Sequence, residues 1–260
     1  MQNPHDSGQL APLRTDDGTT TLVYQKTGVA FRSQRGARTE SQYVFVDGSE
    51  LIRRAAPWRV LELGLGTGMN FLETAKAFVL LGLPGQLDYH ALEPHPISPT
   101  LLSTVHAPTC EATSAGYRLL QAAMATLAHD PRSPIQQRCD KTGIALHLYP
   151  TRWQETILSP LDAHAIYHDP FGPKDAPDCW TTDCFRWASR HLASDGLLVT
   201  YSAAGHVRRA MVEAGFLIGK RPGASGKREM TAAALRADPL AQYKLWRSPK
   251  AGASVRGSAL

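Results

Sequence analysis

The chain has no long hydrophobic run: among its 260 residues, none approaches the ~18 apolar residues of a membrane span. Its first residues also lack a basic stretch followed by an apolar core, so we expect no signal peptide, no membrane association and a cytoplasmic location. The four cysteines, Cys110, Cys139, Cys179 and Cys184, show no CxxC spacing, and no histidines are paired at metal-ligand intervals. The sequence therefore predicts no metal site and no disulfide framework.

Neither sign of charge dominates, because Lys and Arg together number 28 against 23 for Asp and Glu. The resulting formal charge of +5 is compatible with a nucleic-acid substrate but is shared by many unrelated proteins. An apolar fraction of 43% is ordinary for a globular protein, so composition predicts one α/β domain with additions.

A glycine-rich turn follows the short hydrophobic segment Val60–Leu63 and precedes an amphipathic run over residues 69–81. The three glycines of this turn alternate with other residues, at Gly64, Gly66 and Gly68. Glycine permits left-handed backbone angles and close approach to a ligand, and the next helix offers free N–H groups. With Glu62 before it, the turn resembles the S-adenosylmethionine type, whereas the dinucleotide type would place its third glycine at position 69. A purely structural turn is the alternative.

Two further acidic residues stand at the ends of hydrophobic segments. Glu93 closes the segment 87–92 about one βαβ unit downstream, where a carboxylate can accept hydrogen bonds from ribose hydroxyls. Asp169 closes the segment 163–168, and the carboxyl end of a parallel strand faces the ligand crevice. The alternatives are a solvated strand end for Glu93 and a turn-forming Asp-Pro dipeptide for Asp169.

Strand-like and helix-like segments alternate from Trp58 onward, which predicts a mostly parallel seven-stranded sheet with helices on both faces. We place the strands near 58–63, 87–92, 144–149, 163–168, 196–202, 215–219 and 227–232. The helices are expected near 68–82, 97–104, 113–129, 152–158, 178–192 and 205–214. Residues 131–143 are polar with two prolines and are predicted to be a loop.

The chain is predicted to divide into four segments. Residues 1–20 are predicted to be a flexible N-terminus. Residues 21–56 are predicted to form a β-extension with strands at 21–24, 29–31 and 43–46. The main domain covers 57–243, and residues 244–260 read as a flexible tail.

Aromatic and basic residues follow the last two acidic strand ends. Phe171 and Trp180 can anchor the proline-rich loop after Asp169 or stack on a planar group. Four basic residues, Arg208, Arg209, Lys227 and Arg228, are expected to form one patch for an anionic substrate. A solvated helix face is the alternative for the two arginines.

Taken together, these motifs resemble the methyltransferase family that completes 5-methylaminomethyl-2-thiouridine at the wobble position of tRNA. The resemblance covers both the methyltransferase half of the bifunctional MnmC type and the stand-alone MnmD type. The matching stretches run in the family's order from about residue 31 to 232: Gly36, Glu40–Phe45, Leu61–Phe71, Glu93–Pro96, Asp169–Trp180, Ala203–Arg209 and Gly226–Met230.

The resemblance implies a Rossmann-like S-adenosylmethionine-dependent methyltransferase fold and a tRNA substrate. It implies that the cofactor is bound by Glu62, Gly64, Gly66, Gly68, Asn70, Glu93 and Trp153. Asp169 would orient the attacking amine or help remove its proton. Substrate contacts would come from Phe171, Lys174, Trp180, Arg208, Arg209, Lys227 and Arg228.

Two features qualify this resemblance. The family usually has Gly-Asp after the third strand, and its aspartate binds the adenine amino group. Here Arg152 stands in that place, and arginine cannot accept a hydrogen bond. Stacking on Trp153 is the expected substitute. The chain also leaves no room for the flavin-dependent oxidase of the bifunctional type, so a separate oxidase in the same pathway is expected.

Two other functions stay open at this stage. The same fold can methylate another RNA or a small amine, which Arg152 and the modest number of basic residues favour. A catalytically inactive RNA-binding or interaction module is the third reading. Binding of S-adenosylmethionine separates the last from the other two.

Overall fold

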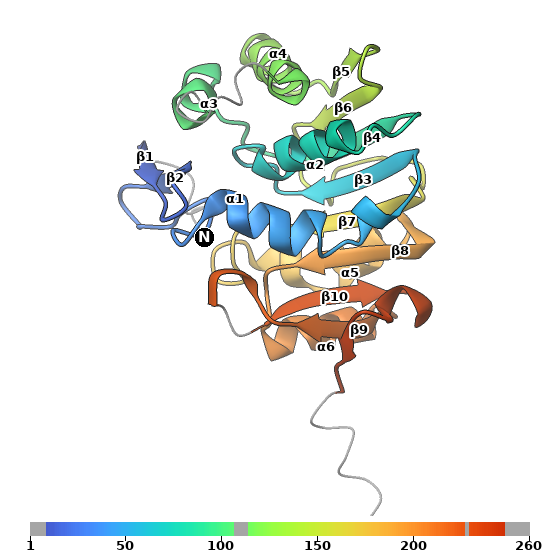
Figure 1. Ribbon diagram of the computed structural model, residues 1–260. Helices are drawn as coiled ribbons and strands as arrows, with labels where there is room; N and C mark the ends of the chain where they lie inside the picture. The colour runs from blue at the N-terminus through green and yellow to red at the C-terminus, as the bar shows by residue number, and fades with distance from the viewer. Residues whose placement is uncertain (1–8, 107–113, 227–228, 248–260) are drawn as a thin grey trace, which may run out of the picture.

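The computed structural model describes residues 9–106, 114–226 and 229–247, and in these ranges it contains a large mixed sheet and a small hairpin (Figure 1). The order of the nine strands in the large sheet is β11-β9-β10-β8-β7-β3-β4-β6-β5. These strands are β3 (Trp58–Leu63), β4 (Leu87–Leu92), β5 (Ile135–Cys139), β6 (Ile144–Tyr149), β7 (Ala163–His168), β8 (Leu192–Thr200), β9 (Leu217–Arg221), β10 (Met230–Ala234) and β11 (Lys244–Leu245).

The central strands of the sheet are parallel and almost continuously buried. Pairs β3–β4, β3–β7, β4–β6 and β7–β8 are parallel, as the hydrophobic runs in the sequence predict. The predicted count of seven strands and the predicted loop over 131–143 are wrong. Strand β5 forms within that loop and pairs antiparallel with β6, its side chains alternating between half-buried and exposed as suits an edge strand. Strands β9, β10 and β11 are also antiparallel.

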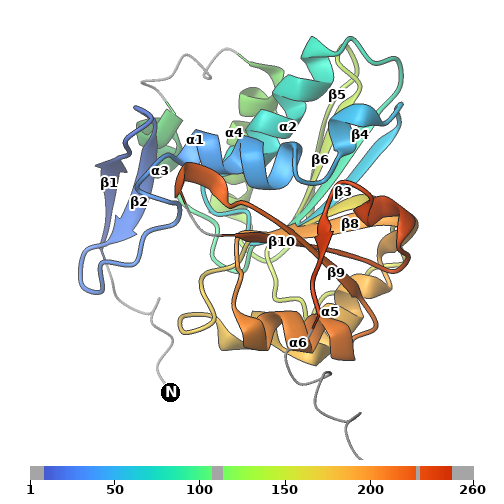
Figure 2. The same cartoon turned by 60° about the horizontal axis from the view of Figure 1, so that its bottom comes forward.

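Helices cover both faces of the sheet, with α2 and α4 on one side and α5 and α6 on the other (Figure 2). They are α2 (Met69–Leu80), α3 (Pro99–His106), α4 (Ala115–His129), α5 (Thr182–Ser189) and α6 (Gly205–Glu213). Each begins within four residues of its predicted start. The predicted helix over 152–158 is wrong, because this segment forms turns between Pro150 and Pro160, and Ile157 is exposed.

The N-terminal segment differs most from its prediction. Strand β1 (Leu10–Arg14) lies inside the predicted flexible region and pairs with β2 (Thr20–Tyr24) in a hairpin. The predicted strand at 29–31 is reduced to a single bridge at Ala30. The predicted strand at 43–46 is wrong, since helix α1 (Ala37–Glu40) continues into a π-helical stretch, Ser41–Val46.

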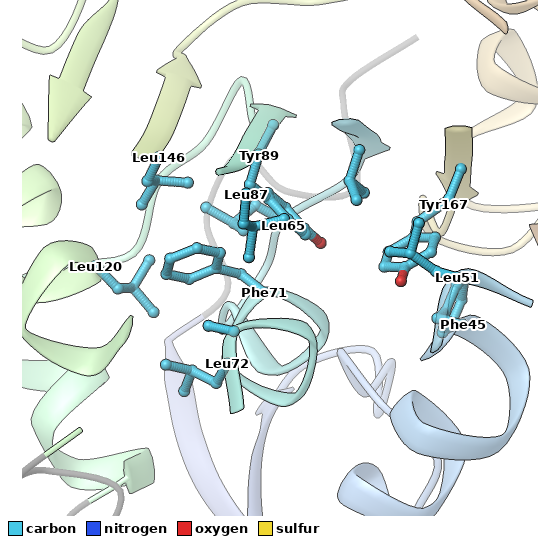
Figure 3. Close-up of a cluster of buried hydrophobic side chains, with 14 of the residues drawn as sticks. Phe45, Leu51, Leu65, Phe71, Leu72, Leu87, Tyr89, Leu120, Leu146 and Tyr167 are labelled. Atoms are coloured by element: carbon cyan, nitrogen blue, oxygen red, sulfur yellow. The ribbon is translucent and has the colours of Figure 1, made fainter. Parts of the chain in front are cut away.

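This helical stretch packs against α2 and the sheet. Val44, Phe45 and Val46 are all buried, which a half-buried strand with alternating sides would not allow. In Figure 3, Phe45 and Leu51 lie against Tyr167 of β7, on the same face of the sheet as Phe71 of α2. The N-terminal segment is therefore part of the main hydrophobic core, where each large side chain contributes roughly 1.5–3 kcal/mol of transfer free energy.

The ends of the chain complete the architecture. Figure 1 shows the β1–β2 hairpin on the side of the sheet where strand β3 has its carboxyl end. Residues 244–245 of the predicted flexible tail pair with β9, while 248–260 lie outside the described residues. No helix in the described ranges is long and apolar enough to cross a membrane.

Candidate active site

A cavity of about 590 Å³ lies at the carboxyl ends of the central strands. Its lining comes from the glycine-rich turn, from the ends of β4 and β6, from the loop after β7 and from the N-terminal segment. The volume lies within the ~300–1,000 Å³ that is usual for a small-molecule site. The position is the one at which parallel α/β sheets bind ligands.

The three glycines of the turn serve two different purposes. Gly64 and Gly66 line the cavity, and all three have positive φ angles. A Cβ on Gly64 would lie 2.7 Å from the carbonyl oxygen of Asp169, so glycine lets β3 and β7 approach there. Gly68 is not among the lining residues, and a Cβ there would lie 2.4 Å from Leu120 Cδ2 of α4. Two of the predicted cofactor-binding glycines thus face the cavity, and the third permits helix packing.

Glu93 lies where the sequence places it, at the end of β4 in the cavity wall. Its carboxylate accepts hydrogen bonds from the backbone N–H groups of Gly66, at 2.8 Å, and His95, at 2.9 Å. Burial raises the pKa of Glu93. The carboxylate is therefore held in one orientation beside the glycine turn, where it can accept from ribose hydroxyls.

Asp169 also lies in the cavity wall, and its carboxylate contacts Asn70 and Arg32, which both also lie beside Glu62. Asn70 Nδ2 donates to Asp169 Oδ2 at 2.8 Å and to Glu62 Oε1 at 2.7 Å. The guanidinium of Arg32 forms a close ion pair with the same Asp169 oxygen and lies 3.9 Å from Glu62 Oε1. Asn70 and Glu62, both predicted to bind the cofactor, are fully buried behind the wall and orient Asp169.

Burial controls the protonation of Glu62. The carboxyl group is completely inaccessible, and this raises its pKa to about 8 although Arg32 acts in the opposite direction. The hydroxyl of Tyr89 donates a hydrogen bond to Glu62 Oε2 at 2.7 Å. Arg32 keeps its charge, because Asp169 and Glu62 outweigh the effect of burial and raise the pKa of the guanidinium.

Three aromatic rings form one wall of the cavity. Phe31 lies 5.0 Å from Phe171 and 5.6 Å from Tyr24 between ring centroids, and Tyr24 lies 6.0 Å from Phe171. All three line the cavity, and two of them come from the N-terminal segment. Such a wall suits a planar group.

Trp180 has the anchoring role that the sequence suggests as one of its two alternatives. Its ring is buried, and its Nε1–H donates to the carbonyl oxygen of Phe171 at 2.8 Å. His168 Nε2 lies 2.8 Å from the carbonyl oxygen of Cys179 and also ties down the loop after β7. Lys174 of this loop is exposed and lines the cavity.

The loop after β6 forms the side of the cavity where adenine recognition is expected. Arg152 is exposed and Trp153 half-buried, and both line the cavity. The Nε1–H of Trp153 is buried and has no hydrogen-bond acceptor among the described residues. A buried donor of this kind is satisfied by a ligand acceptor or by water.

The predicted basic patch requires a correction. Arg208 is buried, pairs with Glu229 at 2.8 Å and donates to Thr231 Oγ1 at 3.0 Å. Its position in the first turns of α6 points it at β10, so it joins the helix to the sheet and does not extend an exposed patch. Arg209 is exposed but does not line the cavity. Lys227 and Arg228 lie outside the described residues.

Sequence reasoning missed the contribution of the N-terminal segment. Tyr24, the last residue of β2, lines the cavity together with Phe31 and Arg32, which follow the hairpin, and Phe31 lies next to Gly66. No local spacing links them to Asp169, so no pattern in the sequence could have identified them. In the described part of the chain, no cluster of three or more His, Cys, Asp or Glu side chains could hold a metal ion.

The residues present fit S-adenosylmethionine. Gly66 leaves room for the cofactor beside the glycine turn. A Cβ at this position would lie 3.2 Å from Phe31 and would narrow that space. Glu93 offers a fixed acceptor for ribose, and Trp153 offers a ring and an unsatisfied N–H for adenine. Asp169 lines the same cavity, beside Gly64.

Comparison with known proteins supports the same cofactor class. A family profile described as S-adenosyl-L-methionine-dependent methyltransferase matches residues 118–236. A bifunctional protein for tRNA 5-methylaminomethyl-2-thiouridine biosynthesis, MnmC, from Burkholderia vietnamiensis is 33% identical over 221 residues, covering 82% of this chain and 33% of the relative. Its counterpart from Ralstonia nicotianae is 32% identical over 212 residues, covering 78% and 31%. The chain thus spans about a third of the length of these relatives.

Solved structures show the fold. The crystal structure of MNMC2 from Aquifex aeolicus matches with a TM-score of 0.69 at 23% identity, covering 90% of this chain and 72% of that chain. A spermidine synthase from Thermotoga maritima matches with a TM-score of 0.55 at 13% identity, covering 92% and 73%. The architecture is therefore the Rossmann-like methyltransferase fold that the sequence predicts, built on a mixed sheet. The chain is thus similar to S-adenosyl-L-methionine-dependent methyltransferases and to part of the MnmC proteins.

Proposed function

We propose that the protein transfers a methyl group from S-adenosylmethionine to the aminomethyl nitrogen of a wobble 5-aminomethyl-(2-thio)uridine in tRNA. The observation that carries this proposal is the position of Asp169, in the wall of a cavity that also holds the glycine turn and Glu93. The likeness to the MnmC proteins supplies the substrate class. Such an activity would place the protein in the cytoplasm.

The bound cofactor would supply an electrophilic methyl group on a sulfonium. The residues of the chain would contribute alignment and charge. Asp169 Oδ2, fixed by Asn70 and Arg32, is set to accept a hydrogen bond from the attacking amine and to stabilise the positive charge that develops on its nitrogen. The aromatic wall of Tyr24, Phe31 and Phe171 would hold the uracil ring.

The aminomethyl group that is methylated has to be formed before this step. We propose a flavin-dependent oxidase of the same pathway as its source, since the matched relatives are described as bifunctional.

The test is nucleoside mass spectrometry of tRNA from a strain that lacks the gene. We expect the aminomethyl nucleoside to accumulate and the methylaminomethyl nucleoside to disappear. Complementation with the wild-type gene should restore the methylated form, and complementation with Asp169→Asn should restore less than about a tenth of it. Unchanged nucleosides in the deletion strain would exclude this substrate.

A small amine is the second candidate substrate, and one observation favours it. Arg208 is internal, so the exposed positive charge available for RNA phosphates is less than the sequence predicts. Methyl transfer to free 5-aminomethyluridine at a kcat/KM equal to that on tRNA would favour this candidate. A much higher kcat/KM on tRNA that falls steeply with salt would favour RNA.

A further inference from the structure

Arg32 lies where the N-terminal segment meets the wall of the cavity. Its side chain is only 3% exposed, yet it is one of the lining residues. The guanidinium pairs with Asp169 and lies 5.7 Å from the centroid of the Phe45 ring. A buried arginine is stable only with charged or hydrogen-bonding partners, so this position is specific.

The partners of Arg32 determine the net charge of this part of the cavity. Two carboxyl groups, Glu62 and Asp169, share a single amide donor, Asn70. Arg32 lies between them, in contact with Asp169 and 3.9 Å from Glu62. We call these four residues the carboxylate floor. Within this group Arg32 supplies the positive charge, so removing Arg32 or one carboxyl group alters the balance of charge.

The pairing also restricts what Asp169 can do. One oxygen of this carboxylate receives both the Arg32 guanidinium and the Asn70 amide, and both interactions favour the ionised form. An anion stabilised in this way accepts hydrogen bonds well and takes up protons poorly. Methyl transfer moves a positive charge from sulfur to nitrogen, so the charge of the floor acts on both the sulfonium and the ammonium product.

We propose that Arg32 is a positioning residue that fixes Asp169 as a hydrogen-bond acceptor, and that its positive charge offsets the carboxylate charge of the floor beside the methyl donor. The inference rests on the proposed function insofar as it requires S-adenosylmethionine in this cavity. It assigns to the N-terminal segment a direct part in setting the electrostatics of the reaction.

The test compares two ligands of nearly equal shape and different charge. S-adenosylmethionine carries a sulfonium and S-adenosylhomocysteine a neutral sulfur, so the ratio of their Kd values by calorimetry at pH 7 reports the charge of the floor. Arg32→Met removes a positive charge from the floor, Asp169→Asn removes a negative charge, and the double variant restores the wild-type balance. Relative to wild type, we expect the preference for S-adenosylmethionine to rise about five- to tenfold in Arg32→Met, to fall in Asp169→Asn, and to return to within about twofold in the double variant.

Two control variants separate charge from structure. Arg32→Lys keeps the charge and should keep the wild-type ratio. Arg38→Met removes a comparable ion pair, between Arg38 Nε and Glu73 Oε1 at 2.8 Å, which joins the same N-terminal segment to α2 outside the cavity lining. It should lower the melting temperature without changing the ratio. If Arg32→Met does not fold, the opposite shift in Asp169→Asn and its reversal in the double variant still decide the matter.

The proposed function and the role of Arg32 fail in different ways. Failure of wild-type protein to bind either ligand would overturn both the proposed function and the inference. Binding of both ligands with a ratio that is the same in wild type, Asp169→Asn and the double variant would overturn the inference alone.

Discussion

Individual residues in the glycine turn differ in function although they look equivalent in the sequence. Gly66 faces the cavity and donates its N–H to Glu93, whereas Gly68 lies under Leu120 of α4. Both have positive φ angles, so the backbone requires glycine at each for the same reason. The side on which a Cβ would project decides whether a substitution affects ligand binding or packing.

Gly68→Ala is expected to destabilise the fold more than Gly82→Ala. Both positions have positive φ, but a Cβ at Gly68 would collide with Leu120, whereas nothing lies within 4 Å of one at Gly82. Gly82→Ala should therefore cost about 1 kcal/mol and Gly68→Ala roughly 1–3 kcal/mol more, measured by urea unfolding. Equal losses in the two variants would contradict the packing role.

At the scale of elements, the loop after β7 is held by bonds at both ends. Trp180 donates to the carbonyl of Phe171, and His168 bonds to the carbonyl of Cys179, so each bond joins the start of the loop to its end. Tyr201 adds a hydrogen bond to the carbonyl of Pro170 at 2.9 Å. The loop therefore presents Phe171 and Lys174 to the cavity from a fixed backbone.

Trp180→Phe should raise the KM for the methyl acceptor severalfold while leaving stability only about 1 kcal/mol lower. The variant keeps the aromatic ring and removes the donor to Phe171. Trp58→Phe is the matched control, because it removes a similar bond, from the indole N–H to the carbonyl of Arg54 at 3.0 Å, at the opposite end of the strands. A similar rise in KM in both variants would show that loop position is not the cause.

For the whole molecule, two buried groups make stability depend on pH in opposite directions. The folded protein keeps the Glu62 proton up to about pH 8, whereas the unfolded chain releases it near pH 4.5. The folded state therefore holds more protons in this interval and loses stability as pH rises through it. Burial lowers the pKa of His168 from 6.5 to about 4, so stability is lost as pH falls through that interval.

Glu62→Gln should remove only the first of these dependences. The amide that this substitution introduces can accept from Asn70 and donate to the hydroxyl of Tyr89, so both contacts can persist without a buried ionisable group. The quantity to compare is the free energy of unfolding of the variant minus that of wild type. This difference should be roughly 1–3 kcal/mol larger at pH 8 than at pH 5. Chemical denaturation at the two pH values measures this, and an unchanged difference between the two proteins would exclude the titration of Glu62. The loss below pH 6.5 should be shared by both.

Features that depend on local order along the chain could be predicted from the amino-acid sequence. Hydrophobic runs of strand length, separated by amphipathic segments, are enough to locate β3, β4, β6 and β7, because burial of a parallel strand requires them. The glycine turn and the acidic residues at Glu93 and Asp169 could be placed at the same edge, since parallel strands end together. These features predict the fold and the part of the site that the glycine turn, Glu93 and Asp169 form.

Tertiary structure alone decided the rest. Tyr43–Val46 has the composition of a strand, but it is helical because three consecutive side chains are buried against the sheet. Arg208 has the sequence context of an exposed helix start, but Glu229 holds it inside. Arg32 reaches Asp169 because the segment after the hairpin passes beside the glycine turn, where Phe31 lies next to Gly66. Ion pairs between distant segments depend on the path of the chain in space, and periodicity, which is a local property, carries no information about that path.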